Sequence, residues 1–264
     1  MNKKPIKILP SFLNLIGFLA IVIVNSLAVI LPINNKTTEE LSDKYPNLFV
    51  PAGITFSIWG IIYILLALFI VYQLVAAFKE KIKDKGLFEK IGIIFFISAI
   101  LNVGWILAWH YEIVWLSLII MIMLLASLIV IYLRLKIGKS DSSNSEKVFV
   151  HIPFSVYLGW ITIATIANVT ALLVKMGWDR FGLSEQFWTV LVIAVGILIT
   201  LAVLFIRNDI FYSLVVDWAF IGILIKRLGD KNTPAQSVII TTIIGLAVIT
   251  IGIIIQKIRS KSPY

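Results

Sequence analysis

Long apolar runs separated by short polar segments dominate the chain. A helix needs about 20 mostly apolar residues to cross the ~30 Å hydrocarbon core of a bilayer. The apolar runs predict eight spans, at approximately 11–32, 49–78, 90–109, 114–133, 148–175, 187–206, 210–225 and 237–255. The seventh is the shortest and contains Asp217, so we expect it to be short, tightly packed or partly re-entrant. The predicted fold class is an all-α integral membrane protein.

Composition agrees with this prediction and removes several kinds of site. The 264 residues are 60% hydrophobic and 14% charged, whereas soluble domains carry roughly 25% charged residues. The chain has no Cys, which excludes disulfides, thiolate metal sites and a cysteine nucleophile. Two histidines, His110 and His151, offer little for a multi-histidine metal centre, and none is predicted. Both are expected near span ends, in solvated positions.

The charge distribution predicts the orientation in the membrane. If both termini are cytoplasmic, sixteen of the 23 Lys and Arg residues fall on the inner side, as the positive-inside rule expects. The exceptions are Lys226, Arg227 and Lys231, which follow the seventh span on the outer side. The net charge of +9 is therefore explained by orientation, and no nucleic-acid partner is predicted. We expect a multi-pass protein of the plasma membrane, with the lipid bilayer as its main partner.

The longest outer connection, 33–48, is rich in polar, turn-forming residues. Two interpretations are open at this point. The segment could cover the outer end of the bundle as a lid, or it could be a solvated loop with no specific task.

Three predicted spans carry an aromatic and polar stripe at helical spacing. The stripes are Thr55, Trp59 and Tyr63; Asn102, Trp105 and Trp109; and Tyr157, Trp160, Ala164 and Asn168. Unpaired amides are costly in hydrocarbon, so these faces should point into the bundle. Asn102 and Asn168 could simply join helices by hydrogen bonds. Alternatively, the rings could line a pocket for a flat apolar ligand whose polar edge is oriented by the amides.

Three segments resemble a known family. They are YPNLFVPAGITFSIWGIIY at 45–63, LNVGW at 101–105 and YLGWITIATIAN at 157–168. In this order they are similar to the loop and second helix, the third helix and the fifth helix of the tryptophan-rich sensory protein/translocator protein (TspO/MBR) family. The resemblance covers roughly 11–178. It implies a core of five helices and a homodimer.

The resemblance also implies a pocket under the first outer loop that binds porphyrins and other hydrophobic ligands, with no required cofactor. Matching positions place Trp59, Tyr63, Asn102, Trp105, Trp160 and Ala164 in that pocket, and Trp109 where the family carries a pair of phenylalanines. Together with Tyr157 and Asn168 from the stripes, these are the candidate ligand-binding residues. Val156 departs from the family pattern, which often has Pro before the Tyr of the fifth helix.

The remaining sequence predicts an extension, so we divide the chain into a TspO-like core, 1–178, and a C-terminal part, 179–264, with about three further spans. Its intramembrane acid is Asp217. Such a group is a candidate for a proton or ion relay. It could equally form a structural hydrogen bond with Ser213 or with a neighbouring helix.

The function favoured by the sequence is membrane-embedded binding or sensing of a flat hydrophobic ligand, with a porphyrin as the leading candidate. The alternative is a transporter or permease subunit for a small hydrophobic or amphipathic molecule, with proton coupling through Asp217 as one form of it. No grouping of histidine, acid and nucleophile indicates catalysis, so no catalytic residues are predicted. Degradation of a bound porphyrin is a minor possibility.

Overall fold

The computed structural model describes residues 5–31, 33–78, 90–230 and 235–259. Every regular element in these ranges is a helix, which confirms the all-α fold class. The long helices are α1 (Pro5–Ile30), α3 (Ile58–Phe78), α5 (Ile94–His110), α6 (Val114–Leu135), α8 (Ile152–Lys175), α9 (Glu185–Arg207), α10 (Ile210–Gly229) and α11 (Gln236–Arg259). The short ones are η1 (Ile33–Asn35), α2 (Thr38–Asp43), η2 (Gly53–Ser57), α7 (Asn144–Glu146), η3 (Lys147–His151) and η4 (Arg180–Gly182).

Six helical segments of the described chain are long and apolar enough to cross a membrane, so the protein is a multi-pass membrane protein. The other two expected spans correspond to α5, which has 17 residues, and to α10. Charged residues interrupt or end the apolar run of α10 at Asp217, Lys226 and Arg227. However, α10 is one continuous helix of 20 residues, roughly 30 Å at 1.5 Å per residue. The re-entrant alternative for this segment is therefore wrong.

Apolar side chains fill the core of the bundle and also cover its outside, and several amides are buried within it. Ile243, Ile251 and Ile254 of α11 are each about half exposed, in positions that lipid would cover. The buried amides of the described residues are Asn14, Asn25, Gln73, Asn102, Asn168 and Gln256. Because hydrocarbon cannot satisfy hydrogen-bonding groups, this distribution is typical of a protein whose solvent is a bilayer.

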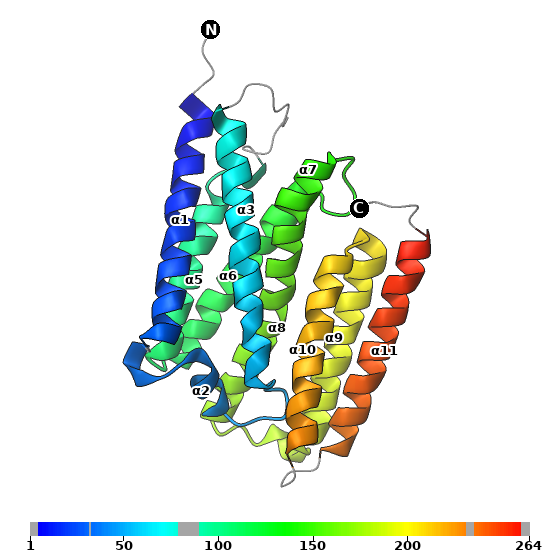
Figure 1. The fold of residues 1–264 in the computed structure, drawn as a ribbon. Helices are drawn as coiled ribbons and strands as arrows, with labels where there is room; N and C mark the ends of the chain where they lie inside the picture. The colour runs from blue at the N-terminus through cyan, green and yellow to red at the C-terminus, as the bar shows by residue number, and fades with distance from the viewer. Residues whose placement is uncertain (1–4, 32, 79–89, 231–234, 260–264) are drawn as a thin grey trace.

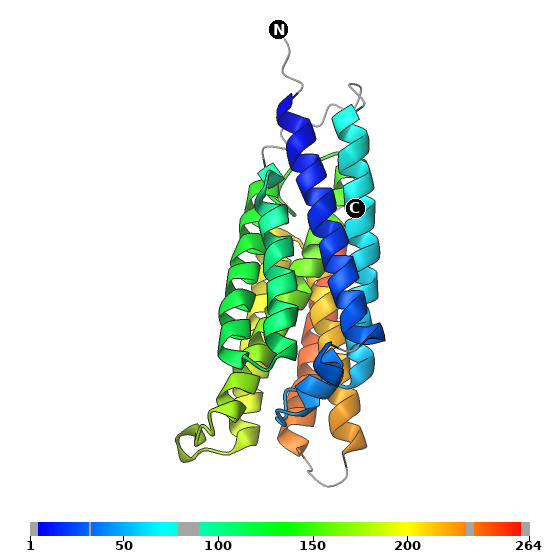
Figure 2. The same ribbon diagram turned by 90° about the vertical axis from the view of Figure 1, so that its left-hand side faces the viewer.

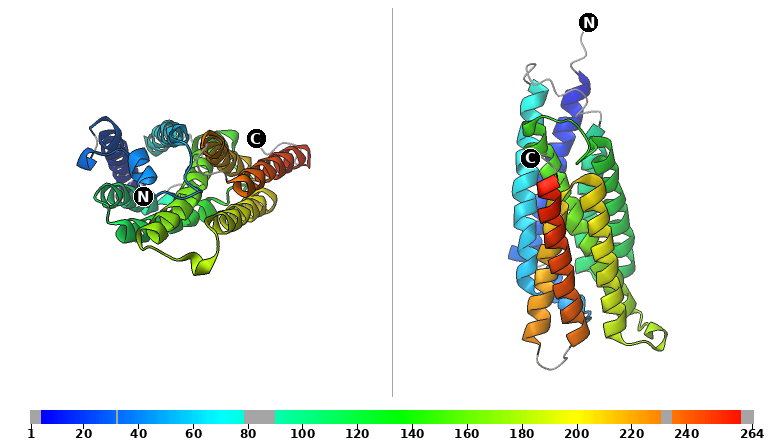
Figure 3. Two further views of the ribbon diagram at one scale, coloured as in Figure 1. Left: turned by 90° about the horizontal axis from the view of Figure 1, so that it is seen from below. Right: turned by 90° about the vertical axis from the view of Figure 1, so that its right-hand side faces the viewer.

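Helix α8 occupies the centre of the bundle (Figures 1 and 3). On one side α3 and α6 pack against it, and α1 and α5 complete this group; on the other, α10 packs against α8 and carries α9 and α11. Gly159 permits the close approach of α8 and α10, because a Cβ atom there would lie 3.1 Å from the carbonyl oxygen of Tyr212. The start of α1 and the end of α11 lie at the same end of the bundle (Figure 1).

Two expected spans begin later than the apolar pattern predicts. Residues 49–52 are not helical, and the 3-10 turn η2 precedes α3, since Pro51 lacks the N–H that a helix interior needs. In the third span, Gly92 has a φ of 51°, and α5 begins only at Ile94. The lysines of 79–89, which the orientation argument assigns to the inner side, lie outside the described residues.

Candidate ligand-binding site

The connection between α1 and α3 crosses the end of the bundle opposite the start of α1 (Figures 1 and 2). Its helix α2 begins with a capping box, in which Thr37 and Glu40 exchange hydrogen bonds between side chain and backbone. Helix α2 packs against α5. We call residues 33–57 the lid segment, because Thr38 and Ser42 form part of the wall of a cavity beneath it.

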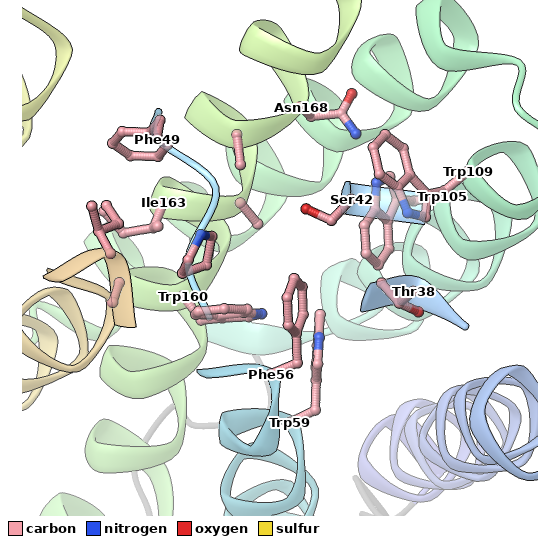
Figure 4. A pocket seen from close by; sticks show the side chains of 15 residues that line it. Thr38, Ser42, Phe49, Phe56, Trp59, Trp105, Trp109, Trp160, Ile163 and Asn168 are labelled. Atoms are coloured by element: carbon pink, nitrogen blue, oxygen red, sulfur yellow. The ribbon is translucent and has the colours of Figure 1, made fainter. Parts of the chain in front are cut away.

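This cavity lies between the lid segment and helices α3, α5, α8 and α10 (Figure 4). Its volume is about 50 Å³, well below the roughly 300–1,000 Å³ of most ligand pockets, so in this conformation the lining side chains nearly fill it. The lining residues are Thr38, Ser42, Phe49, Pro51, Phe56, Trp59, Trp105, Trp109, Trp160, Ile163, Ala164, Ala167, Asn168, Ala219 and Ile223. None of them is charged.

Trp59 is the centre of the aromatic cluster. Its ring is stacked with Tyr63 at 5.7 Å and with Trp105 at 6.1 Å between centroids. It meets Trp160 edge to face at 6.1 Å and Tyr157 at 6.2 Å. Offset and edge-to-face pairs of this kind add stability beyond their buried area. The cluster therefore forms a stiff aromatic wall.

Three indole N–H groups of this wall have no hydrogen-bond acceptor. They belong to Trp105, Trp109 and Trp160, whose side chains are 5%, 5% and 3% exposed. A buried donor without a partner is costly, particularly where no water can replace the missing acceptor. Because all three residues line the cavity, an acceptor placed in it can satisfy donors that the protein leaves unpaired.

The candidate residues predicted from sequence fall into two groups. Six of them line the cavity: Trp59, Trp105, Trp109, Trp160, Ala164 and Asn168. The other three, Tyr63, Asn102 and Tyr157, stand behind this wall. A role in ligand binding remains a prediction for all nine residues.

Asn102 lies at the centre of a hydrogen-bond chain that joins three helices. Asn25 of α1 donates to its Oδ1 at 2.8 Å, and its own Nδ2 donates to the Tyr157 hydroxyl of α8 at 3.0 Å. In the same way, Ser117 of α6 donates to Oδ1 of Asn168 at 3.1 Å. These contacts agree with the interpretation that Asn102 and Asn168 join helices by hydrogen bonds. Asn168 also lines the cavity.

Sequence reasoning did not single out several lining residues. Phe49, Pro51 and Phe56 lie inside the quoted segment 45–63, where they could have been noted. Ala219 and Ile223 of α10 had no such signal, because they are ordinary apolar residues of a helix far away in sequence.

Glu112, in the turn between α5 and α6, holds the lid segment on one side. Its carboxylate accepts hydrogen bonds from Lys36 at 2.7 Å, from Lys44, and from the Tyr45 hydroxyl at 3.2 Å. The two lysine contacts lower the pKa of Glu112 to about 2. Tyr45 in turn packs its ring 5.9 Å from Trp109. We call Glu112, Lys36, Lys44 and Tyr45 the Glu112 cluster.

His110 is fully buried, so its expected solvated position is wrong. Its Nδ1 donates to the carbonyl oxygen of Ile33 at 3.1 Å, and its Nε2 lies 3.2 Å from the Thr38 hydroxyl. His110 therefore fixes the lid segment to the end of α5. His151 is buried as well, 3.7 Å from Glu146 at the other end of the bundle.

Helix α10 holds the opposite side of the lid segment. The Ala52 N–H donates to the Gly222 carbonyl at 2.9 Å, and the Trp218 indole donates to the Thr55 carbonyl at 2.9 Å. Lys226, whose position was unexpected from the positive-inside rule, pairs with Asp43 of α2. The basic end of α10 thus has a partner in the acidic part of the lid segment.

Asp217 lies in α10 but outside the cavity lining. Its Oδ2 accepts a hydrogen bond from Thr250 of α11 at 3.2 Å, and its buried Oδ1 has no partner. The expected alternative partner, Ser213, instead donates to the backbone carbonyl of Asp209. The structural hydrogen bond expected for Asp217 is therefore made with a neighbouring helix and not with Ser213.

Fold and site together define a class: an integral membrane helical bundle with an aromatic-walled, uncharged cavity under the lid segment. The chain matches the model of the TSPO-like protein family over residues 11–255, and it belongs to that family. The match includes α9, α10 and most of α11, beyond the segment of roughly 11–178 that suggested the resemblance. Comparisons with curated proteins and with solved structures give no significant match.

Proposed function

We propose that the protein binds a flat hydrophobic molecule with hydrogen-bond acceptors in the cavity beneath the lid segment, and that a porphyrin is a suitable ligand. The observation that carries the proposal is the set of three unpaired indole donors on residues that line an aromatic cavity. Flat aromatic faces favour stacking with a planar ring. Membership of a TSPO-like family supports the same coarse function of membrane-embedded binding or sensing.

The cavity also restricts the orientation of such a ligand. Because its lining carries no charged side chain, a buried carboxylate would lose its hydration without gaining a counter-charge. The carboxylates of a porphyrin would therefore lie toward the lid segment, where Lys36 and Lys44 stand, and the ring would lie against Trp59 and Trp160. The cavity is narrow between its rings, so a porphyrin would need the lid segment to move outward.

The experiment is a titration of the purified full-length protein in detergent with protoporphyrin IX, followed by tryptophan fluorescence. We expect saturable quenching that is at least about fivefold weaker in a Trp59→Phe, Trp160→Phe double variant. The matched control is Trp115→Phe, which removes an indole that is 58% exposed and outside the cavity. Quenching that does not saturate in folded protein, or that is equal in all three proteins, would reject the site.

Transport is the second candidate, because Asp217 has an unpaired buried carboxylate oxygen within a membrane helix. A proton-coupled transporter would accumulate its cargo in proteoliposomes when a pH gradient is applied, and Asp217→Asn would abolish that dependence without reducing the folded yield. A binding protein would show saturable ligand binding and no uptake. Unchanged uptake in Asp217→Asn would remove the proton role.

We further propose that the lid segment faces the outside of the cell and that both termini are cytoplasmic, in line with the positive-inside rule. Since the chain has no Cys, single cysteines report their side without background. In intact cells, Glu39→Cys in the lid segment should react with a membrane-impermeant maleimide, and Asp141→Cys should not. The reverse pattern would invert the topology.

A further inference from the structure

A second hollow lies between α8 and α9, and it is separate from the cavity described above. Both helices pack against α10, and the hollow is open to the outside of the bundle, because Val169, Leu191 and Val195 of its walls are 37%, 42% and 44% exposed. Its volume is about 650 Å³. We call it the α8–α9 groove; its lining residues are Pro46, Asn47, Phe49, Ile166, Val169, Thr170, Leu173, Val174, Gly177, Trp178, Arg180, Glu185, Trp188, Thr189, Leu191, Val192 and Val195.

The walls of the groove present carbon atoms almost throughout. Its two threonine hydroxyls are already satisfied, since Thr170 donates to the Ala167 carbonyl at 2.8 Å and Thr189 to the Glu185 carbonyl at 2.9 Å. The side-chain amide of Asn47 donates to the Tyr45 carbonyl. In contrast to the indoles of the aromatic cavity, these hydroxyl and amide donors already have hydrogen-bond acceptors. The groove is therefore suited to a hydrocarbon chain.

The length and position of the groove match one leaflet of a bilayer. On α8 it extends from Ile166 to the helix end and on α9 from Glu185 to Val195, roughly 15 Å along each helix at 1.5 Å per residue. That is about half of the ~30 Å hydrocarbon core. The groove therefore runs from the membrane surface to near the midplane.

The outer rim of the groove has the groups that accompany lipid headgroups. Trp178 and Trp188 are in contact at 4.9 Å between ring centroids, and indoles favour the interface. Arg180, of η4, is 46% exposed on its side chain and lies 3.7 Å from Glu185. Glu185 is already engaged, because its Oε1 accepts the Leu48 N–H at 2.8 Å. The exposed guanidinium of Arg180 is thus available to bind a phosphate group, through two parallel N–H donors.

From these observations we propose that the α8–α9 groove is a binding site for one phospholipid of the outer leaflet, with its acyl chains between α8 and α9 and its phosphate at Arg180. Phe49 lines both the groove and the aromatic cavity, so its side chain stands between two different sites. The phospholipid site does not depend on the ligand proposed above; its assignment to the outer leaflet rests on the orientation proposed above.

The test is native mass spectrometry of the full-length protein in detergent, titrated with dioleoyl phosphatidylglycerol and, in parallel, with oleic acid. We expect a saturable one-to-one phospholipid adduct. Val169→Trp fills the groove from a position on α8 that is 37% exposed, so it should remove the phospholipid adduct. Leu191→Trp, on the opposite wall, should have the same effect. Arg180→Gln should weaken the adduct at least fivefold, with rescue by Arg180→Lys to within about twofold.

Leu198→Trp is the matched control, since it adds the same side chain to α9 at a lipid-facing position outside the groove. It should retain the adduct. Equal adducts in all variants, or binding of oleic acid with exclusion of the phospholipid, would overturn the proposal. Protoporphyrin titration of Val169→Trp separates the two sites: unchanged quenching with loss of the lipid adduct supports an independent lipid site, whereas loss of quenching alone would contradict it.

Discussion

At the scale of single residues, the polar stripes of the bundle perform two different tasks. The indoles of Trp105, Trp109 and Trp160 keep free N–H donors at the cavity. Asn102, from the same stripe as Trp105, uses its amide to join α1 to α8. The three-residue spacing puts both side chains on one helical face, but their neighbours decide which hydrogen bonds they make.

We predict that Asn102→Leu lowers stability more than it lowers ligand affinity. The substitution leaves Asn25 and Tyr157 without their bonds to the amide, at a cost of about 1 kcal/mol for interhelical bonds in membranes. A loss of this size lowers the Tm by roughly 2–4 °C in a chain of this length. Thermal unfolding in detergent measures it. Trp160→Phe should lower ligand affinity more than it lowers stability. An Asn102→Leu variant with normal Tm and no ligand binding would instead place Asn102 in the ligand-binding site.

At the scale of elements, the lid segment is held from two sides by different chemistry. The Glu112 cluster binds it to the turn between α5 and α6 through charged side chains. On the α10 side, Lys226 and Asp43 form a further charged pair, whereas the hydrogen bond between the Ala52 and Gly222 backbones has no titrating group. The charged contacts therefore depend on pH, and the backbone contact to α10 does not.

We predict that the lid segment loosens at acid pH from the α5–α6 side. The pKa of Glu112 is lowered from the ordinary value of 4.5 to about 2 by Lys36 and Lys44. A lowered folded-state pKa means that the contact stabilises the lid fully above about pH 4.5 and is lost as the pH falls toward 2. Hydrogen exchange of residues 36–45 should be flat from pH 7 to 5, after correction for intrinsic rates, and rise below pH 4.

Glu112→Gln should show faster exchange of this segment at neutral pH and a smaller rise below pH 4; the rise does not vanish, because the Glu40 carboxylate of the same segment, whose pKa is lowered by its hydrogen bonds to Thr37, still titrates. Glu39→Gln, which removes an exposed carboxylate of the same segment, is the matched control and should behave like the unsubstituted protein. Equal protection in Glu112→Gln at pH 7 would show that the α10 contacts suffice to hold the lid.

At the scale of the whole molecule, the C-terminal helices help to build the site. Helix α10 packs against α8 and η2 across the expected boundary between 1–178 and 179–264. Two of its residues, Ala219 and Ile223, line the cavity. The division into two parts remains a prediction, but the cavity has walls from both.

We predict that Gly159→Val weakens ligand binding by separating α10 from α8. The added Cβ would meet the Tyr212 carbonyl oxygen at 3.1 Å and the Val215 Cβ at 3.2 Å, so the helices must move apart. We expect a Tm lower by several degrees and at least threefold weaker protoporphyrin binding. Gly60→Val is the matched control, because a Cβ there meets no atom within 4 Å. Unchanged affinity in folded Gly159→Val would make α10 dispensable for the site.

The sequence by itself determined the class of protein and most of the helices. Burial in hydrocarbon requires long apolar runs and satisfied backbone hydrogen bonds, and this requirement is visible in every span. The indoles of the cavity were also predictable, because Trp59, Trp105 and Trp160 each lie on a stripe of aromatic and polar residues at helical spacing, within recognisable motifs. Where Pro51 and Gly92 interrupt an apolar run, hydropathy alone extended the span too far.

Only the tertiary structure decided which of these residues line the cavity, which join helices and which hold the lid segment. It separated Asn102, Tyr63 and Tyr157 from the cavity wall, brought Ala219 and Ile223 into it, and gave Glu112 and His110 the lid as their partner. The α8–α9 groove has no counterpart in any local pattern, since its walls come mainly from two helices that both pack against α10. Local sequence sets the face on which a side chain lies, whereas helix packing sets what that face meets.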